Sequence, residues 1–144
     1  MFADFLKRLT APAPTQLPET DARLALTALL VRVARTDGEY DADEKARIDT
    51  ITATRYELDA AAVTSLRNKA EQLETEAPDT VRFTRAIKDT VAYDDRVDVI
   101  EALWQVALAD GERTDDEDTV LRLVSHLLGV SDRDSALARQ RVTS

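Results

Sequence analysis

Acidic side chains gather at two places in the sequence, and their types and spacing could bind a metal ion. Carboxylate oxygens are the ligands that hard divalent cations prefer in proteins. The candidate ligands are Asp37, Glu39 and Glu44 at the first place and Asp110, Glu112 and Glu117 at the second. We therefore predict a divalent-cation site, with Ca²⁺ or Mg²⁺ favoured. We also hypothesise that a single site draws carboxylates from both places.

A structural role for these acids is the alternative, and it stays open. Acidic residues in the first turn of a helix complement the helix dipole, and Asp41 is suited to cap a helix. Asp37 and Asp110 do not fit this explanation. Each follows the end of a predicted helix, where the dipole disfavours a negative charge by about 0.3–1 kcal/mol. The pattern is not an EF-hand, because that loop needs glycine at its sixth position and glutamate at its twelfth.

An internal repeat contains both acidic places. Asp37 and Asp110 are 73 positions apart, and two of the three glycines, Gly38 and Gly111, follow them directly. Within residues 30–44, the residues that meet an identical residue at this spacing are Leu30, Val33, Ala34, Asp37, Gly38, Glu39, Asp43 and Glu44. A repeat indicates repeated architecture. We expect two pseudo-symmetric pairs of helices, each with an Asp-Gly-Glu corner, related by a pseudo-twofold axis and joined by two further helices.

Helical periodicity and capping residues predict an all-α fold of about six to eight helices. Apolar residues recur at helical spacing, and no segment shows sustained alternation typical of a strand. Residues 2–9 read as a short amphipathic helix, residues 10–18 as a proline-rich linker, and residues 19–144 as the helical domain. The expected boundaries are a first helix over about 20–36, then helices starting near Asp41, Asp59, Asp79, Asp94 or Asp95, Thr114 and Ser131, the last ending near Arg139.

The composition excludes several classes of function. The 144 residues carry a formal net charge of −9, which repels nucleic-acid phosphates and anionic membrane surfaces. The absence of cysteine excludes disulfides, thiolate zinc sites and thiol redox chemistry. No apolar run approaches the ~20 residues that span a bilayer, so we expect no stable membrane insertion and a cytoplasmic protein.

Other candidate chemistry is sparse. His126 is the single histidine, and it has no second catalytic group at its repeat position. Trp104 lies on an apolar helical stripe, so we expect it in the core. Carboxylate pairs can hydrolyse glycosides, but such sites usually need a cleft with aromatic platforms, and aromatic residues are few. No phosphate-binding glycine loop, Ser-His-Asp set or HExxH motif occurs. The sequence therefore predicts a protein that is not an enzyme.

The two corners resemble the TerB-like family, which is named for bacterial tellurite-resistance proteins. The matching stretches are residues 33–44 and 106–117, each an apolar helix ending in Ala-x-x-Asp-Gly-Glu before an acidic helix start, and residues 127–131 are also similar. Related domains occur at the N-terminus of a membrane-anchored DnaJ-like co-chaperone. The resemblance covers about residues 20–140. It implies an all-helical domain with an acidic, metal-binding surface, no established enzymatic activity, and the six carboxylates above as candidate ligands.

The sequence thus predicts a non-enzymatic binding module in a stress response. Its ligand would be a divalent cation, a partner protein, or a partner under cation control, and self-association is also open. The first alternative is a protein-interaction scaffold whose acidic corners are purely structural. The second is a small carboxylate-dependent metalloenzyme.

Overall fold

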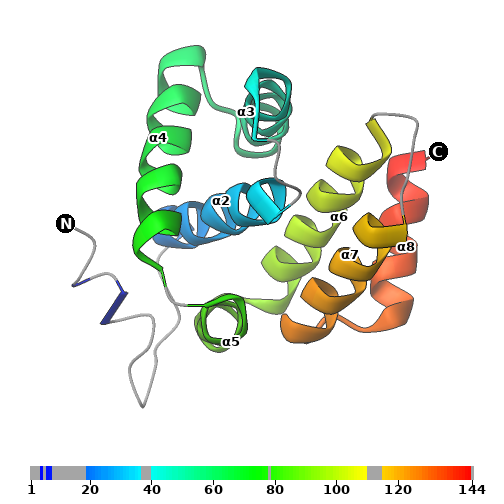
Figure 1. Ribbon diagram of the computed structural model, residues 1–144. Helices are drawn as coiled ribbons and strands as arrows, with labels where there is room; N and C mark the ends of the chain where they lie inside the picture. Colours follow the sequence, from blue (N-terminus) through cyan, green and yellow to red (C-terminus); the bar gives the residue numbers. More distant parts are fainter. Residues whose placement is uncertain are drawn as a thin grey trace. The chain divides into compact units, whose positions relative to one another are not determined.

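Helices form all the regular secondary structure of the residues described in the computed structural model (Figure 1). The structure describes residues 4, 6–7, 19–36, 40–77, 79–109 and 115–143, and within these the side chains of residues 19, 36, 106–109, 115–120 and 143 are not described. The predicted all-α class is confirmed. The predicted linker and nearly all of the predicted N-terminal helix lie outside the described residues. Within them, no helix is long and apolar enough to cross a membrane.

The first compact unit consists of three helices, α2 (Glu19–Thr36), α3 (Ala42–Tyr56) and α4 (Ala60–Glu76). Helix α2 packs mainly against α4, and α3 packs against both. Their apolar faces meet in a core that buries Ala25, Leu29, Val31, Ile48, Val63, Ala70 and Leu73. Burial of these faces is what makes three amphipathic helices stable as a unit.

Aspartates begin three of the helices, as the sequence predicted. The Asp41 carboxylate accepts a hydrogen bond from the Glu44 amide at 3.0 Å, and the Asp59 carboxylate accepts one from Ala62 at 2.8 Å. Asp79 does the same for helix α5 (Thr80–Thr90), accepting from the Arg82 amide at 2.9 Å. Each bond satisfies an amide that would otherwise have no partner in the first turn.

The second compact unit contains α5, α6 (Tyr93–Ala109), α7 (Asp115–Leu127) and α8 (Asp132–Thr143). Helix α6 packs mainly against α8, and α7 packs against α5 and α6. Among the described side chains, its core buries Phe83, Ile87, Ile100, Leu121, Val124 and Leu128. Trp104 is 8 % exposed, so its predicted core position is confirmed.

Two predicted boundaries in this unit were wrong. Helix α6 begins at Tyr93, before the predicted start at Asp94 or Asp95. Both aspartates lie in its first turn, where their charge complements the helix dipole. Helix α8 does not end near Arg139 but continues to Thr143, and Arg141 in its last turn pairs with Glu101 of α6 at 3.2 Å. This contact supports the final turn of α8.

The helix boundaries of the two units correspond in order. Helices α2 and α6 end at Thr36 and Ala109, and α3 and α7 begin at Ala42 and Asp115, a spacing of 73 positions in both cases. Left-handed residues follow α3 and α7, namely Glu57 with φ 54° and Gly129 with φ 70°. The correspondence extends to α4 and α8, which the sequence comparison had not paired.

Helices α4 and α8 correspond at a spacing one residue shorter. Asp59 caps α4, and the Ser131 hydroxyl caps α8 by accepting from the Asp134 amide at 3.1 Å. These two caps are 72 positions apart, and so are Glu57 and Gly129. A three-helix order therefore occurs in both units, with α5 as the additional helix of the second.

Candidate functional site

The structure describes only part of the predicted metal site. Asp37, Glu39, Asp110 and Glu112 lie outside the described residues. Glu117 lies in the first turns of α7, but its side chain is not described. Glu44 alone among the six predicted ligands has a described side chain. The structure therefore does not test whether these carboxylates come together, and the cation site stays a prediction.

Glu44 lies half-buried in the first turn of α3. Its amide donates to the Asp41 carboxylate, so Asp41 acts as a helix cap, as the structural explanation requires. Within the parts of the chain that the structure describes, no three Asp, Glu or His side chains are grouped as metal ligands would be. A cation site at the first corner would therefore have to use the carboxylates of residues 37–39.

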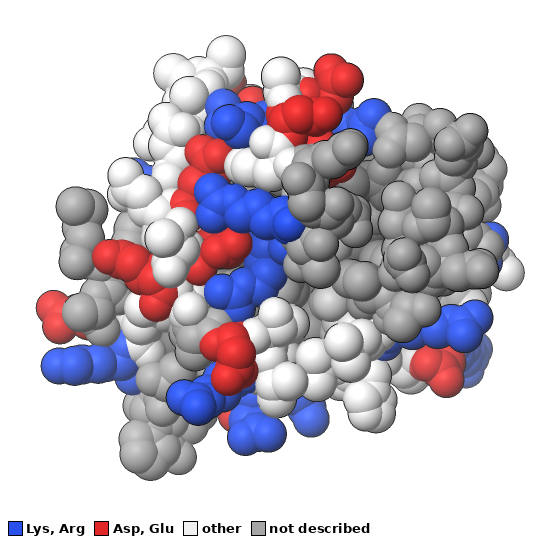
Figure 2. Space-filling view, in the orientation of Figure 1, with Lys and Arg blue, Asp and Glu red and all other residues white. Residues whose placement is uncertain are grey.

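Other carboxylates of the first unit form ion pairs, and those of Glu74 and Asp49 join two helices. Glu74 of α4 contacts two arginines of α2, with 3.4 Å to Arg35 and 3.9 Å to Arg32. Arg67 of α4 contacts Asp49 of α3 at 2.8 Å and Glu71 at 3.3 Å. Figure 2 shows acidic and basic side chains next to one another on the face drawn. These acids stabilise the packing of α2, α3 and α4.

The contacts of Arg67 shift the pKa of its guanidinium group. Burial by itself lowers the pKa of the Arg67 guanidinium, but the hydrogen bond and the charge of Asp49, together with Glu71, outweigh it. The net effect raises the pKa of Arg67 above its ordinary value. The charged form of Arg67 is thus the form that the folded unit favours.

Tyr40 directly follows the first corner, and two cationic groups lie near its ring. The Arg35 guanidinium lies 5.1 Å from the centre of its ring and the Lys45 ammonium 5.2 Å. Its hydroxyl is buried, with Glu71 nearby but not in hydrogen-bond geometry. Burial, reinforced by the Glu71 carboxylate, raises the pKa of Tyr40 above its ordinary value. Tyr40 therefore stays neutral and serves as a packing contact.

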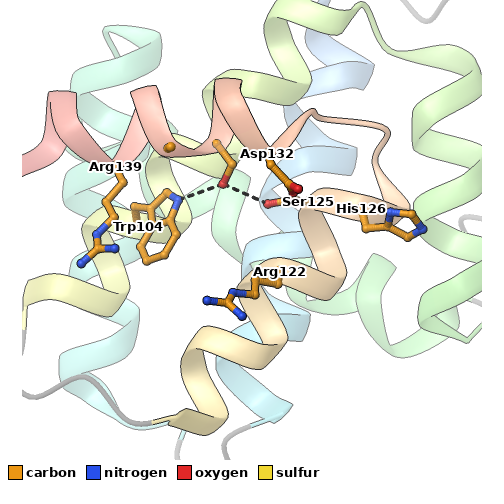
Figure 3. A pocket seen from close by; sticks show the side chains of 8 residues that line it. Trp104, Arg122, Ser125, His126, Asp132 and Arg139 are labelled. Atoms are coloured by element: carbon orange, nitrogen blue, oxygen red, sulfur yellow. Dashed lines mark hydrogen bonds between the residues drawn. The ribbon is translucent and has the colours of Figure 1, made fainter.

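A pocket of about 560 Å³ lies in the second unit, between α6, α7 and α8. Figure 3 shows the side chains that line it, which are Trp104, Arg122, Ser125, His126, Asp132, Ser135, Ala136 and Arg139. Sequence analysis singled out only Trp104 and His126 among them. The others had no signal in the sequence, because they come from two helices and meet only when α7 and α8 pack together.

A short polar chain crosses this pocket. The Trp104 indole nitrogen donates to the Ser135 hydroxyl at 3.3 Å, and the Ser135 and Ser125 hydroxyl oxygens lie 3.4 Å apart (Figure 3). The Arg139 guanidinium lies 5.3 Å from the centre of a Trp104 ring. The ring of His126 points away from Trp104 in Figure 3, so it belongs to the rim of the pocket.

Comparison with known protein families agrees with the resemblance of the two corners. Searches of curated proteins and of solved structures found no match. The family model described as tellurite resistance protein TerB matches residues 23–140, which include α3 to α7 entirely and most of α2 and α8. Because this match covers most of the 144 residues, the chain belongs to the TerB family.

Proposed function

We propose that this TerB-family chain is a non-enzymatic binding module whose Asp-Gly-Glu corners bind a divalent cation, with Ca²⁺ or Mg²⁺ favoured. One observation carries the proposal. The same acidic sequence occurs twice, and both times it connects a helix that ends one residue before the aspartate to a helix that begins five residues after it. The two corners therefore have the same length, and the helices on either side end and begin at equivalent positions.

The described contacts narrow the choice of ligands at the first corner. Asp41 is used as a cap, and Asp49, Glu71 and Glu74 are used in ion pairs. The proposed ligands are accordingly the carboxylates of the corner sequences themselves, Asp37, Glu39 and Glu44 in the first and Asp110, Glu112 and Glu117 in the second. Because the family model is described by tellurite resistance, we infer that the module acts in a stress response.

Thermal unfolding with and without metal tests the proposal. The melting temperature would be measured in EDTA and then with Ca²⁺, Mg²⁺, Mn²⁺ or Zn²⁺. A cation at about 100 times its Kd stabilises the folded state by about 2.7 kcal/mol, which raises the melting temperature by several degrees. We expect this rise in the wild type and its loss in Asp37→Asn/Asp110→Asn.

A matched control is Asp89→Asn/Asp95→Asn, which removes two negative charges from exposed positions outside the corners. This variant should keep the full response to the cation. The proposal is wrong if no metal raises the melting temperature. It is equally wrong if the corner variant responds as strongly as the control variant does.

A protein-interaction scaffold with structural corners is the second candidate. The Asp41 cap favours it, because at least one acid of the first corner region has a purely structural role. The same unfolding experiment separates the two candidates, since a scaffold would show no response to any cation. The carboxylate-dependent metalloenzyme would additionally require turnover that both corner substitutions abolish.

A further inference from the structure

We propose that the pocket between α6, α7 and α8 binds a small organic oxyanion, that is, a carboxylate or a phosphate ester attached to an apolar body. The two arginines of the pocket would hold the anionic group, and Trp104 would contact the body of the ligand. This proposal is independent of the cation proposal, because it concerns other residues and a ligand of opposite charge.

Two corresponding positions of the two units differ in charge at one of the pair and agree at the other. In the first unit, Asp49 of α3 and Arg67 of α4 form a 2.8 Å ion pair. At the spacing of α3 and α7, which is 73 positions, Asp49 corresponds to Arg122. At the spacing of the α4 and α8 caps, which is 72 positions, Arg67 corresponds to Arg139. The second unit thus has two guanidinium groups where the first has a guanidinium and its carboxylate.

Neither arginine of the pocket has an ion-pair partner among the described residues. The contact found for Arg139 is the one with the Trp104 ring. One carboxylate, that of Asp132, is among the described lining residues, and it lies in the first turn of α8, where it complements the helix dipole. Among the described lining side chains, two guanidinium groups against one carboxylate leave an excess of positive charge. In a chain whose formal net charge is −9, this excess is local to the pocket.

The hydroxyl groups of the pocket leave a further donor. Trp104 donates its N–H to Ser135, and a hydrogen bond between Ser135 and Ser125 uses one of the two hydroxyl hydrogens. Each serine has one hydrogen to donate, so one hydroxyl hydrogen remains whichever way the bond points. Ser125 is only 3 % exposed. A hydroxyl donor that has no acceptor among the described residues, beside the buried Ser125, is suited to an oxygen atom of an anion.

The size and the apolar wall of the pocket indicate an organic ligand. Its volume of about 560 Å³ exceeds that of a bare inorganic ion and lies in the range of small-molecule sites. The Trp104 indole and Ala136 supply apolar lining beside the polar groups. A ligand with an oxyanion and a flat apolar part would contact both kinds of lining. Arginine binds such oxyanions through paired N–H groups.

Tryptophan fluorescence offers a direct test, because Trp104 is the single tryptophan of the sequence. The full-length chain would be titrated with phenyl phosphate, benzoate, inorganic phosphate and uncharged benzyl alcohol. We expect a saturable change with phenyl phosphate, with benzoate, or with both. The stronger of the two identifies the phosphate ester or the carboxylate as the anionic group. Inorganic phosphate should bind more weakly, because it lacks the apolar body.

Substitution of one arginine distinguishes anion binding in the pocket from a nonspecific change in Trp104 fluorescence. Arg122→Gln should weaken binding of the better anion about tenfold, because it removes charge-assisted hydrogen bonds. Arg122 is the residue of choice, since Arg139 lies against the reporter ring and would change the fluorescence directly. The matched control is Arg133→Gln, an exposed arginine of α8 that does not line the pocket. It should bind like the wild type.

Three results would overturn the proposal. The first is the absence of a saturable change with either organic anion. The second is binding of benzyl alcohol as tight as that of the anions, which would show that charge plays no part. The third is an Arg122→Gln variant that has a normal circular dichroism spectrum and melting temperature and binds as tightly as Arg133→Gln.

Discussion

The contact between α3 and α4 in the first unit differs from the contact between α7 and α8 in the second. In the first unit Arg67 joins α4 to α3 by its contact with Asp49, and Glu71 adds a second contact. In the second unit the corresponding Arg139 and Arg122 cannot pair with each other, and a pocket lies beside them. The same order of helices thus has an internal ion pair in the first unit and a pocket in the second, and the side chains at the corresponding positions differ.

Two further positions are aliphatic in the first unit and can form hydrogen bonds in the second. Val31 and Val63 are buried in the first unit, at 0 % and 5 % exposure. At the helix spacings above, they correspond to Trp104 and Ser135. The first unit thus fills the space with aliphatic side chains, whereas the second has an indole and a hydroxyl that bond to each other. We interpret this part of the first unit as closed by packing, whereas the corresponding part of the second unit lines the pocket.

The largest expected effect tests whether both units depend on the same core position. Ile48 in α3 and Leu121 in α7 are 1 % and 3 % exposed and correspond at the spacing of 73. Ile48→Ala and Leu121→Ala should each reduce the free energy of unfolding by about 2–5 kcal/mol, because each leaves a cavity. Urea unfolding followed by circular dichroism measures both. A loss below about 1 kcal/mol for either variant would contradict the buried position given to it.

The second-largest expected effect on stability compares the ion-paired Arg67 of the first unit with Arg122 of the second. Asp49→Asn removes the carboxylate partner of Arg67, whose side chain is only 16 % exposed. We expect a loss of about 1–2 kcal/mol in the free energy of unfolding. Arg122→Gln removes a side chain without an ion-pair partner in the described part of the chain, so its effect should stay within about 0.5 kcal/mol. Equal losses of unfolding free energy for Asp49→Asn and Arg122→Gln would show that the Asp49–Arg67 ion pair contributes no more than the Arg122 side chain does.

The smallest effect concerns the left-handed residues that end α3 and α7. Gly129→Ala should destabilise by about 1 kcal/mol, because a side chain disfavours this conformation. The added Cβ would also lie 2.9 Å from the Lys88 side chain, which is flexible enough to move. Glu57→Gly should change stability by less than about 0.5 kcal/mol, since relief of backbone strain is offset by the greater entropy that glycine loses on folding. Melting temperatures of both variants measure this, and a Glu57→Gly variant destabilised as much as Gly129→Ala would contradict it.

Much of the fold could be predicted from the sequence because the signals are local. Asp41, Asp59 and Asp79 cap their helices as predicted, and Gly129 ends α7. The correspondence of α4 with α8 could not be predicted in this way. The corners correspond at a spacing of 73 positions, but α4 and α8 correspond at 72. A comparison at 73 positions therefore does not align α4 with α8, and their sequences share no run of identical residues. The length of α8 was missed because its last turn is supported by a contact with α6, distant in sequence.

The candidate sites could be predicted only in part. The acidic corners stand out as a repeated sequence, but of their six proposed ligands only the Glu44 side chain is described. The pocket gave no sequence signal, since Arg122 and Arg139 are ordinary surface residues of two amphipathic helices when each is read alone. They stand out only when they are compared with the corresponding Asp49 and Arg67, and this correspondence requires the helix boundaries of the structure.

The most direct test of this account is to give the second unit the charge pattern of the first. Arg122→Asp places a carboxylate at the position that corresponds to Asp49, within the pocket that Arg139 also lines. A partly exposed ion pair contributes about 0.2–1 kcal/mol, so we expect the melting temperature to rise by about 1–4 °C. The Trp104 fluorescence response to the organic anion should be lost in the same variant. A lower melting temperature together with an unchanged anion response would contradict the account.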